Sequence, residues 1–271
     1  MNYHSDKWVM EQVQRHYNEA LKIYKKEQII GIFVQGSTNY GLDTENSDID
    51  TKCILAPTFY DIAMAKPMIS TTHILDNNEH IDAKDIRAYF SCFRKQNLNF
   101  LEILFTPYFI VNPLYINEWI KLVDYREMIA HMNPYRAVKS MKGIALEKYH
   151  AMEHRYPSKV DIIDKMGYDP KQLHHLARVD NYLTRYIAGD TYENCLVPDE
   201  KTSQFLLDIK NGKLDLAAAK ALADICLDHI TKIADKFCEK TEEKEDETMR
   251  ALLEEVQYNI MKIAIKKELK D

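Results

Sequence analysis

Two aspartates stand one residue apart at the start of an apolar run. Asp48 and Asp50 flank Ile49 in the segment SDIDTKCIL, residues 47–55. Alternate residues of a strand share a face, so we expect the two carboxylates side by side, with Ile49 turned into the core. Carboxylate oxygens are hard ligands of the kind that Mg²⁺ or Mn²⁺ prefers, and a bound cation offsets their mutual repulsion. The pair therefore predicts a metal site suited to phosphoryl or nucleotidyl transfer. Enzymes with this chemistry often use a two-metal mechanism.

Gly36 and Ser37, which follow the preceding apolar run, indicate the same chemistry. A glycine after a strand lets backbone N–H groups approach a phosphate closely, and a serine hydroxyl adds a further donor. Tyr40 lies in the same predicted phosphate loop. The structural alternative is that Gly36 makes a plain turn and that the two aspartates are ordinary surface residues of a strand.

The full spacing resembles a known family. A strand, Gly36 and Ser37, a gap of about ten residues and then Ser-Asp-Ile-Asp are similar to the signature of the DNA polymerase beta superfamily of nucleotidyltransferases. Three blocks resemble its RNA-ligase-associated, RNA repair branch, in the same order: QGSTNYGLDTENSDID, DIRAYFSCFRKQNLNFLEILFTP and GYDPKQLHHLARV. The resemblance implies a mixed sheet backed by helices, Mg²⁺-dependent transfer of a nucleoside monophosphate from an NTP such as ATP, and a helical domain that closes over the nucleotide.

A third carboxylate completes such a site in the family that the chain resembles. The segment IDAKD offers two candidates, Asp82 within the apparent strand and Asp85 at the start of the following helix. Asp85 suits the N-cap of that helix, yet alignment of the DIR block with the family favours Asp85 as the equivalent acidic position. Both residues therefore stay catalytic candidates, and Asp82 is placed first as the third metal ligand. Its role would be to bind the metal and help take the acceptor's proton. Glu102 is a further carboxylate, for which helix packing with a polar partner is the alternative.

A basic row is predicted on a helix in the second half of the chain. Pro170 suits the first turn of a helix, and basic residues follow it about one turn apart. Such a row could bind a triphosphate, as the resemblance supports, or be a solvated helix face. The row and two weaker candidates for the same role comprise Lys171, His175, Arg178, Lys139 and Lys142.

The elements expected to carry the aspartates form an α/β module. Apolar residues about 3.6 positions apart predict an amphipathic helix that ends near Lys26. Branched runs at 28–35 and 49–55 predict two strands joined by a polar loop. A third strand precedes Asp85, which is placed to cap a helix whose buried stripe is Ile86, Tyr89, Phe90 and Phe93.

Beyond about Pro113 the pattern is helical, and the acidic segment 241–247 indicates a linker or helix start. Two apolar stripes are predicted there: Leu222, Ile225, His229, Ile233 and Phe237, and then Leu253, Val256, Ile260 and Ile263. The fold class is therefore α+β. We expect a nucleotidyltransferase catalytic domain over residues 1–112 and a helical nucleotide- and substrate-binding domain over residues 113–271.

Composition limits the functional classes. A net charge of −6 disfavours a protein that coats nucleic acid through its overall field. Five widely spaced cysteines without a CxxC pair favour reduced thiols in a cytosolic, cytoplasmic protein. Neither an export signal nor an apolar stretch long enough for membrane insertion is indicated.

Three functions stay open from the sequence. The first is an active nucleotidyltransferase acting on an RNA end, with the acceptor class taken from the resemblance. The second is the same transfer to a protein side chain or a small hydroxylated molecule, which the acidic net charge slightly favours. The third is a catalytically lapsed nucleotide-binding regulatory module, against which the intact Asp48 and Asp50 argue.

Overall fold

The computed structural model describes residues 2–270, which fold as two compact units. The sheet unit comprises Met1–Met132 and Glu245–Asp271, and the helical unit comprises Asn133–Lys244. An extended segment ahead of the last helix joins them, as the acidic composition of residues 241–247 predicted.

The sheet unit contains a five-stranded mixed sheet in the order β3-β4-β2-β1-β5. Strands β2 and β4 pair in parallel, and the other neighbours are antiparallel. The mixed α+β class predicted from the sequence is therefore confirmed. The strands are β1 (Ile29–Gln35), β2 (Asp50–Leu55), β3 (Ser70–Ile74), β4 (His80–Asp85) and β5 (Phe109–Val111).

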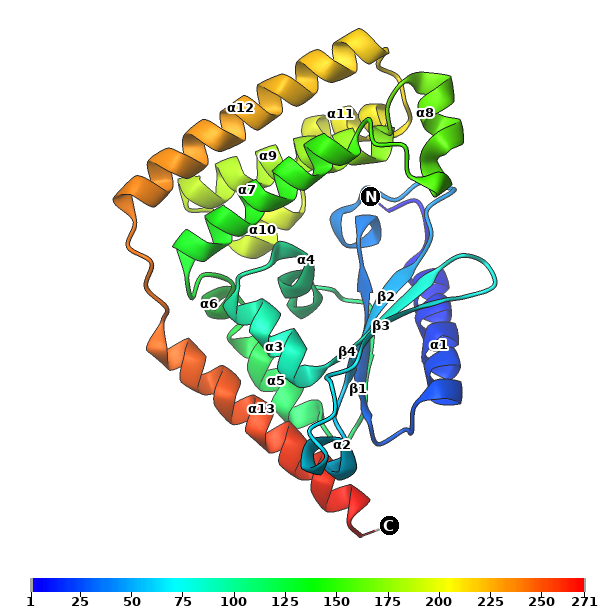
Figure 1. Ribbon diagram of the computed structural model, residues 1–271, viewed down its shortest axis with the longest axis vertical. Coiled ribbons are helices and arrows are strands. Elements are labelled where there is room, and N and C mark those ends of the chain that lie inside the picture. Colours follow the sequence, from blue (N-terminus) through cyan, green and yellow to red (C-terminus); the bar gives the residue numbers. More distant parts are fainter. Residues whose placement is uncertain (1, 271) are drawn as a thin grey trace. The chain divides into compact units, whose positions relative to one another are not determined.

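Helices cover both faces of this sheet. Figure 1 shows α1 on one side of the sheet and α3 and α5 on the other. The α1 face holds an apolar core, where Val9 and Val13 pack against Ile32, Ile49 and other strand residues. The helices of this unit are α1 (Asp6–Ile23), α2 (Phe59–Ala63), α3 (Ile86–Arg94), α4 (Leu98–Leu101), α5 (Ile116–Asp124), α6 (Arg126–Ala130) and α13 (Glu247–Glu268), with the short 3₁₀ turns η1 (Ser37–Tyr40) and η2 (Glu102–Leu104).

The predicted domain boundary after residue 112 differs from the boundaries of the two units. Helix α5 belongs to the sheet unit because its Trp119 ring packs 4.2 Å from the ring of Phe33 on β1. Helix α13 belongs there as well, since it packs on α5 and α3. Its buried stripe contains Leu253, Val256 and Ile260 as predicted, but Ala264 replaces Ile263.

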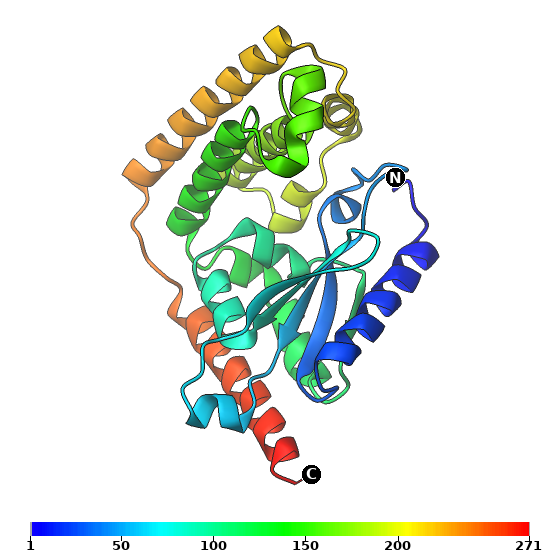
Figure 2. The ribbon, with the colours of Figure 1, turned by 45° about the vertical axis from the view of Figure 1, so that its right-hand side comes forward.

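The helical unit is built around α9, which packs against α7, α10, α11 and α12. Its Pro170 occupies the first turn after the N-cap Asp169, as the sequence predicted. Figure 2 shows α12, in yellow to orange, running alongside α7 in green. The helices are α7 (Pro134–Ala151), α8 (Val160–Met166), α9 (Pro170–Ala188), α10 (Tyr192–Leu196), α11 (Glu200–Lys210) and α12 (Leu216–Lys240), with η3 (Pro157–Lys159).

The buried face of α12 is not the predicted one. Leu222 and Ile225 head the predicted stripe, yet Ile225 is 66% exposed. Mostly small side chains face the neighbouring helices instead. The distance between packed helices depends on the side chains at their contact, and small side chains allow a close approach. The buried residues of α12 are Ala219, Ala223, Cys226, Ile230 and Ala234.

Two further expectations concern thiols and membranes. Cys53, Cys92, Cys226 and Cys238 are free thiols. Across residues 2–270, no helix combines the length and the apolar character needed to span a bilayer.

Candidate active site

The turn after β1 opens onto free space. Gly36 has φ +90°, a conformation that residues with a side chain rarely adopt, and a Cβ built there would meet no atom within 4 Å. Ser37 follows in the 3₁₀ turn η1 and is half-buried. Its hydroxyl makes no hydrogen bond to any residue between 2 and 270, so it is available to a ligand. The predicted loop therefore offers a donor beside open space.

Glu102 supports this loop from inside the protein. Its buried carboxylate accepts a hydrogen bond from the Tyr40 hydroxyl and one of 3.3 Å from the Gly36 N–H. Tyr40, predicted to contact the nucleotide, is only 3% exposed and belongs to this support. The Gly36 N–H is likewise directed at Glu102, which corrects its predicted role as a phosphate donor. The alternative for Glu102, packing with polar partners, is confirmed.

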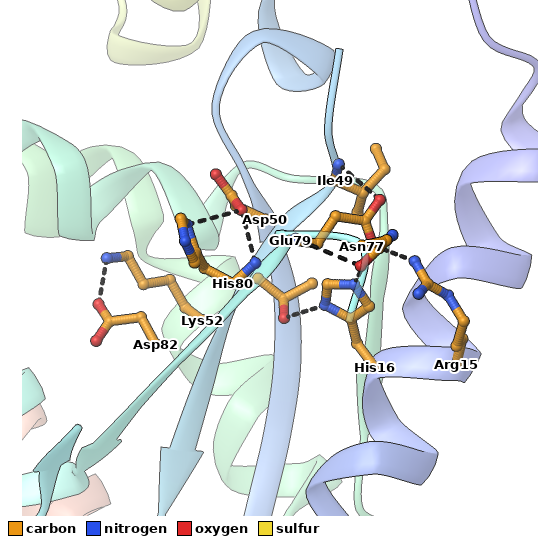
Figure 3. A network of polar contacts seen from close by, with 10 residues as sticks. Arg15, His16, Ile49, Asp50, Lys52, Asn77, Glu79, His80 and Asp82 are labelled. Carbon is orange, nitrogen blue, oxygen red and sulfur yellow. Dashed lines mark hydrogen bonds and ion pairs between the residues drawn. The ribbon is translucent and has the colours of Figure 1, made fainter. Parts of the chain in front are cut away.

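Asp50 is the first residue of β2, and Asp48 and Ile49 directly precede the strand. Ile49 is fully buried, whereas Asp48 is exposed and Asp50 is half-exposed, as expected from the alternation of side chains along a strand. The Asp50 Oδ1 accepts a hydrogen bond of 2.9 Å from the His80 N–H and lies 3.4 Å from the His80 Nδ1. Figure 3 shows this contact on the side of β2 away from α1. One carboxylate is thus oriented by the neighbouring strand and stays open to solvent.

Asp82, predicted as the third metal ligand, is paired with a lysine. Lys52 and Asp82 are register partners on β2 and β4, and the Lys52 Nζ lies 2.6 Å from the Asp82 Oδ2. The ammonium also lies 4.6 Å from the centre of the Phe100 ring. Within the described part of the chain, no group of three or more His, Cys, Asp or Glu side chains is placed to hold a metal. The predicted set of Asp48, Asp50 and Asp82 is therefore not assembled.

Asp85 is a structural residue. It is 1% exposed, and it caps α3 by accepting a hydrogen bond of 2.8 Å from the Arg87 N–H. The Arg87 guanidinium binds both carboxylate oxygens, at 2.9 and 2.6 Å, and this hydrogen bonding raises the pKa of Arg87. The predicted N-cap is confirmed. The same contacts occupy the carboxylate, which corrects the choice of Asp85 as a catalytic group.

A polar network that the sequence did not reveal lies on the α1 face. The buried Glu79 carboxylate contacts Arg15 and His16 of α1 and the backbone of Ile49, as Figure 3 shows. His16 also contacts the Thr51 hydroxyl at 2.9 Å. The one available signal was the position of His16, seven residues after Val9 on the otherwise apolar stripe of α1.

The predicted basic row lies on α9 of the helical unit. Lys171 is exposed, His175 is half-buried and Arg178 is 5% exposed. Burial, together with the neighbouring cations Arg178 and Lys171, holds the pKa of His175 well below its ordinary value. The predicted role of His175 in binding the triphosphate stays a prediction. The placement of the row opposite the aspartates stays a prediction.

The two weaker candidates lie on α7 and have local partners. The Lys142 Nζ lies 2.6 Å from Asp235 Oδ1 on α12. The Lys139 ammonium lies 5.1 Å from the centre of the Tyr135 ring, one turn earlier on the same helix. Lys142 thus already has an anionic partner, whereas Lys139 has an aromatic one.

No protein-family model and no curated protein matches the chain. Among solved structures, the chain is similar to a nucleotidyltransferase-like protein from Exiguobacterium sibiricum 255-15, with 12% identity, coverage of 84% of this chain and 75% of that chain, and a TM-score of 0.29. A TM-score this low gives no correspondence between the two sites, so the chemistry of this chain follows from its own side chains.

Proposed function

We propose that this protein is a nucleotidyltransferase that transfers a nucleoside monophosphate from an NTP to a hydroxyl acceptor. One observation carries the proposal: Gln35 pairs with Asp50 in the antiparallel β1–β2 ladder. The open turn at Gly36 and Ser37 therefore begins beside the strand end that carries Asp48 and Asp50. An open turn that presents the Ser37 hydroxyl, together with a pair of accessible carboxylates at one sheet end, suits a metal-bound nucleoside triphosphate.

Asp48 and Asp50 fit a divalent cation such as Mg²⁺ or Mn²⁺. In nucleotide enzymes Mg²⁺ commonly takes one or two protein carboxylates together with substrate phosphates, so a third protein ligand is not required. Both carboxylates are accessible, whereas Asp82 is engaged by Lys52. When bound, the ion would offset phosphate charge and favour departure of pyrophosphate.

The chain's own residues bind and orient the nucleotide. The Ser37 hydroxyl donates a hydrogen bond to a phosphate oxygen, and the His80 N–H keeps Asp50 in one orientation. Lys171 and Arg178 of the helical unit stay predicted sources of positive charge for the triphosphate. An NTP brings about four negative charges, and a chain with a net charge of −6 needs local cations to bind it.

The acceptor that we propose is an RNA end, in RNA repair or end modification. Support comes from the three sequence blocks that resemble the RNA-ligase-associated branch of the superfamily. A protein side chain or a small hydroxylated molecule is the alternative acceptor. RNA binding depends steeply on salt because phosphate contacts release counterions, whereas binding of a small acceptor does not.

The test is transfer of label from each NTP with Mg²⁺ to separate pools of RNA, protein and small molecules. We expect labelled RNA with the wild-type protein and none with Asp50→Asn. Label found on protein or on a small molecule would contradict RNA as the acceptor but would still support nucleotidyl transfer. Nucleotide binding without transfer to any pool would contradict the proposal and support the lapsed regulatory module.

A further inference from the structure

Glu79 stands immediately before β4 and is buried on the α1 face. Its Oε1 accepts a hydrogen bond of 3.3 Å from the N–H of Ile49, the residue between the two aspartates. Its Oε2 lies 2.8 Å from the His16 Nε2 and also contacts the Arg15 guanidinium. Figure 3 shows these partners around one carboxylate. A buried carboxylate is costly unless it is paired in this way, so its partners determine where it lies.

The network keeps this carboxylate ionised. Burial alone would raise the pKa of Glu79, but hydrogen bonds from His16, Asn77 and the Ile49 N–H, together with the Arg15 charge, lower it to about 2. Its oxygens are therefore acceptors at neutral pH. The Ile49 N–H thus faces a full negative charge, and hydrogen bonds to charged groups are stronger than those between neutral groups.

The contacts extend along three consecutive residues of the site segment. Ile49 is held by Glu79, and Asp50 accepts from the backbone N–H of His80, the residue next to Glu79. Thr51 is held by His16, whose Nδ1 lies 2.9 Å from the Thr51 hydroxyl. The backbone around Asp50 is therefore fixed from both sides of the sheet.

We propose that Glu79 is a positioning residue that orients Asp48 and Asp50 for the metal-bound nucleotide. The inference rests on the proposed function. Fixing the peptide plane at Ile49 sets the directions of the side chains on either side of it, and a metal site needs its ligands held to within a fraction of an ångström. Groups that orient ligands without touching the metal typically contribute about 10–100-fold to metal affinity or activity.

The experiment compares Glu79→Ala with Asn112→Ala, a matched control. Asn112 is also a buried polar residue of the sheet unit that hydrogen-bonds backbone groups, including the Ile29 carbonyl at the far end of β1. Both variants should lower the Tm. Glu79→Ala alone should weaken binding of Mn²⁺ by about 10–100-fold and lower kcat by a similar factor, with the NTP KM nearly unchanged. Binding of Mn²⁺ is followed by electron paramagnetic resonance without nucleotide.

Glu79→Gln supplies the second arm and guards against misfolding of the alanine variant. Its side-chain oxygen still accepts from the Ile49 N–H, so we expect recovery of part of the Mn²⁺ affinity and slow exchange of the Ile49 amide hydrogen. Mn²⁺ affinity and kcat that stay at wild-type values in both Glu79 variants would overturn the positioning role and leave Glu79 a link between α1 and the sheet. Absence of Mn²⁺ binding by the wild-type protein would overturn it too.

Failure of the proposed function gives a different result. If the wild-type protein transfers no nucleotide but binds Mn²⁺, and Glu79→Ala weakens that binding, the transferase proposal fails while the positioning role stands. If transfer occurs and responds equally to Glu79→Ala and Asn112→Ala, the transferase proposal stands and the positioning role fails.

Discussion

The two faces of the sheet differ at the end where β2 begins. On the α1 face, Ile49 and Thr51 are fully buried, and the polar groups around them bond to one another through His16 and Glu79. On the opposite face, the side chain of Asp50 is 32% exposed, beside a His80 side chain that is 43% exposed. The same short segment thus contributes to a closed network and to an open surface.

The closed face is suited to hold the segment in place, whereas the open face is suited to bind a ligand. A buried polar group that is already paired cannot take up a ligand without losing its hydrogen bonds in a poorly hydrated place. A half-exposed carboxylate loses only bound water when it takes up a ligand. We therefore expect substitutions on the open face to change activity and substitutions on the closed face to change stability first.

The largest expected effect is on the open face. Asp50→Asn should lower transfer at least about 100-fold, because several kcal/mol of charge stabilisation by the metal are lost. The free energy of unfolding should change by no more than about 0.5 kcal/mol, since the side chain is partly exposed and its oxygen still accepts from His80. Labelled-NTP transfer and urea unfolding measure the two quantities. Full activity would remove Asp50 from the metal site.

As the pH falls, the helical unit should lose stability at a higher pH than the network on the closed face. The folded pKa of Glu79 is lowered from 4.5 to about 2, so the stability that this group contributes is complete above about pH 4.5 and declines as pH falls toward 2. Burial lowers the pKa of His174 in the helical unit from 6.5 to about 4. Because the unfolded chain binds this proton first, stability of the helical unit should fall between about pH 6.5 and 4.

Hydrogen exchange of backbone amides at a series of pH values checks this order. Protection in α9 should decrease at a higher pH than protection of Ile49. The variant Glu79→Gln should remove the decline below pH 4.5 and leave the decline at higher pH unchanged. Simultaneous loss of protection in both units would contradict the assignment.

Ser37→Ala tests the turn on the open face. Loss of one hydrogen bond to a charged phosphate should cost about 1.5–3 kcal/mol in kcat/KM. Folding should be unaffected, because the hydroxyl has no partner among the residues described. Steady-state kinetics with each NTP measure the effect. An unchanged kcat/KM would make Ser37 a turn residue only.

The smallest effect concerns the Lys52–Asp82 ion pair, which lies on the same side of the sheet as Asp50 but is mostly buried, so its substitution should change stability. Lys52→Met should destabilise the protein by about 1–2 kcal/mol, since Asp82 is left mostly buried without its partner. The double variant Lys52→Met and Asp82→Asn should recover part of this loss. Thermal unfolding of the single and double variants gives the coupling energy. Abolished Mn²⁺ binding in Asp82→Asn would instead identify Asp82 as a metal ligand.

Periodicity in the sequence was enough to predict the elements that carry the candidate site. Strands β1 and β2, helix α3 and the Asp85 cap follow from local patterns, because each depends on residues near in sequence. Strand β3 had no pattern to find, since four of its five residues are exposed. The face of α12 was misassigned because its contacts use small residues, which carry little hydrophobic signal.

The site was predicted less fully because its contacts join distant segments. The Lys52–Asp82 pair depends on the parallel register of β2 and β4, which no local pattern encodes. The contact between His16 and Glu79 joins residues 63 positions apart. Sequence patterns identified the residues that could do chemistry, but not which of them bond to one another.

The discontinuity of the sheet unit has a consequence for biosynthesis. Helix α13 covers α3 and α5, yet the ribosome makes it only after all of Asn133–Lys244. At about 5–20 residues per second, the apolar surface that α13 covers stays open for roughly ten seconds on each nascent chain. The helical unit is continuous and can fold during that time. A chaperone that binds nascent chains therefore has a defined apolar target on α3 and α5 until α13 leaves the exit tunnel.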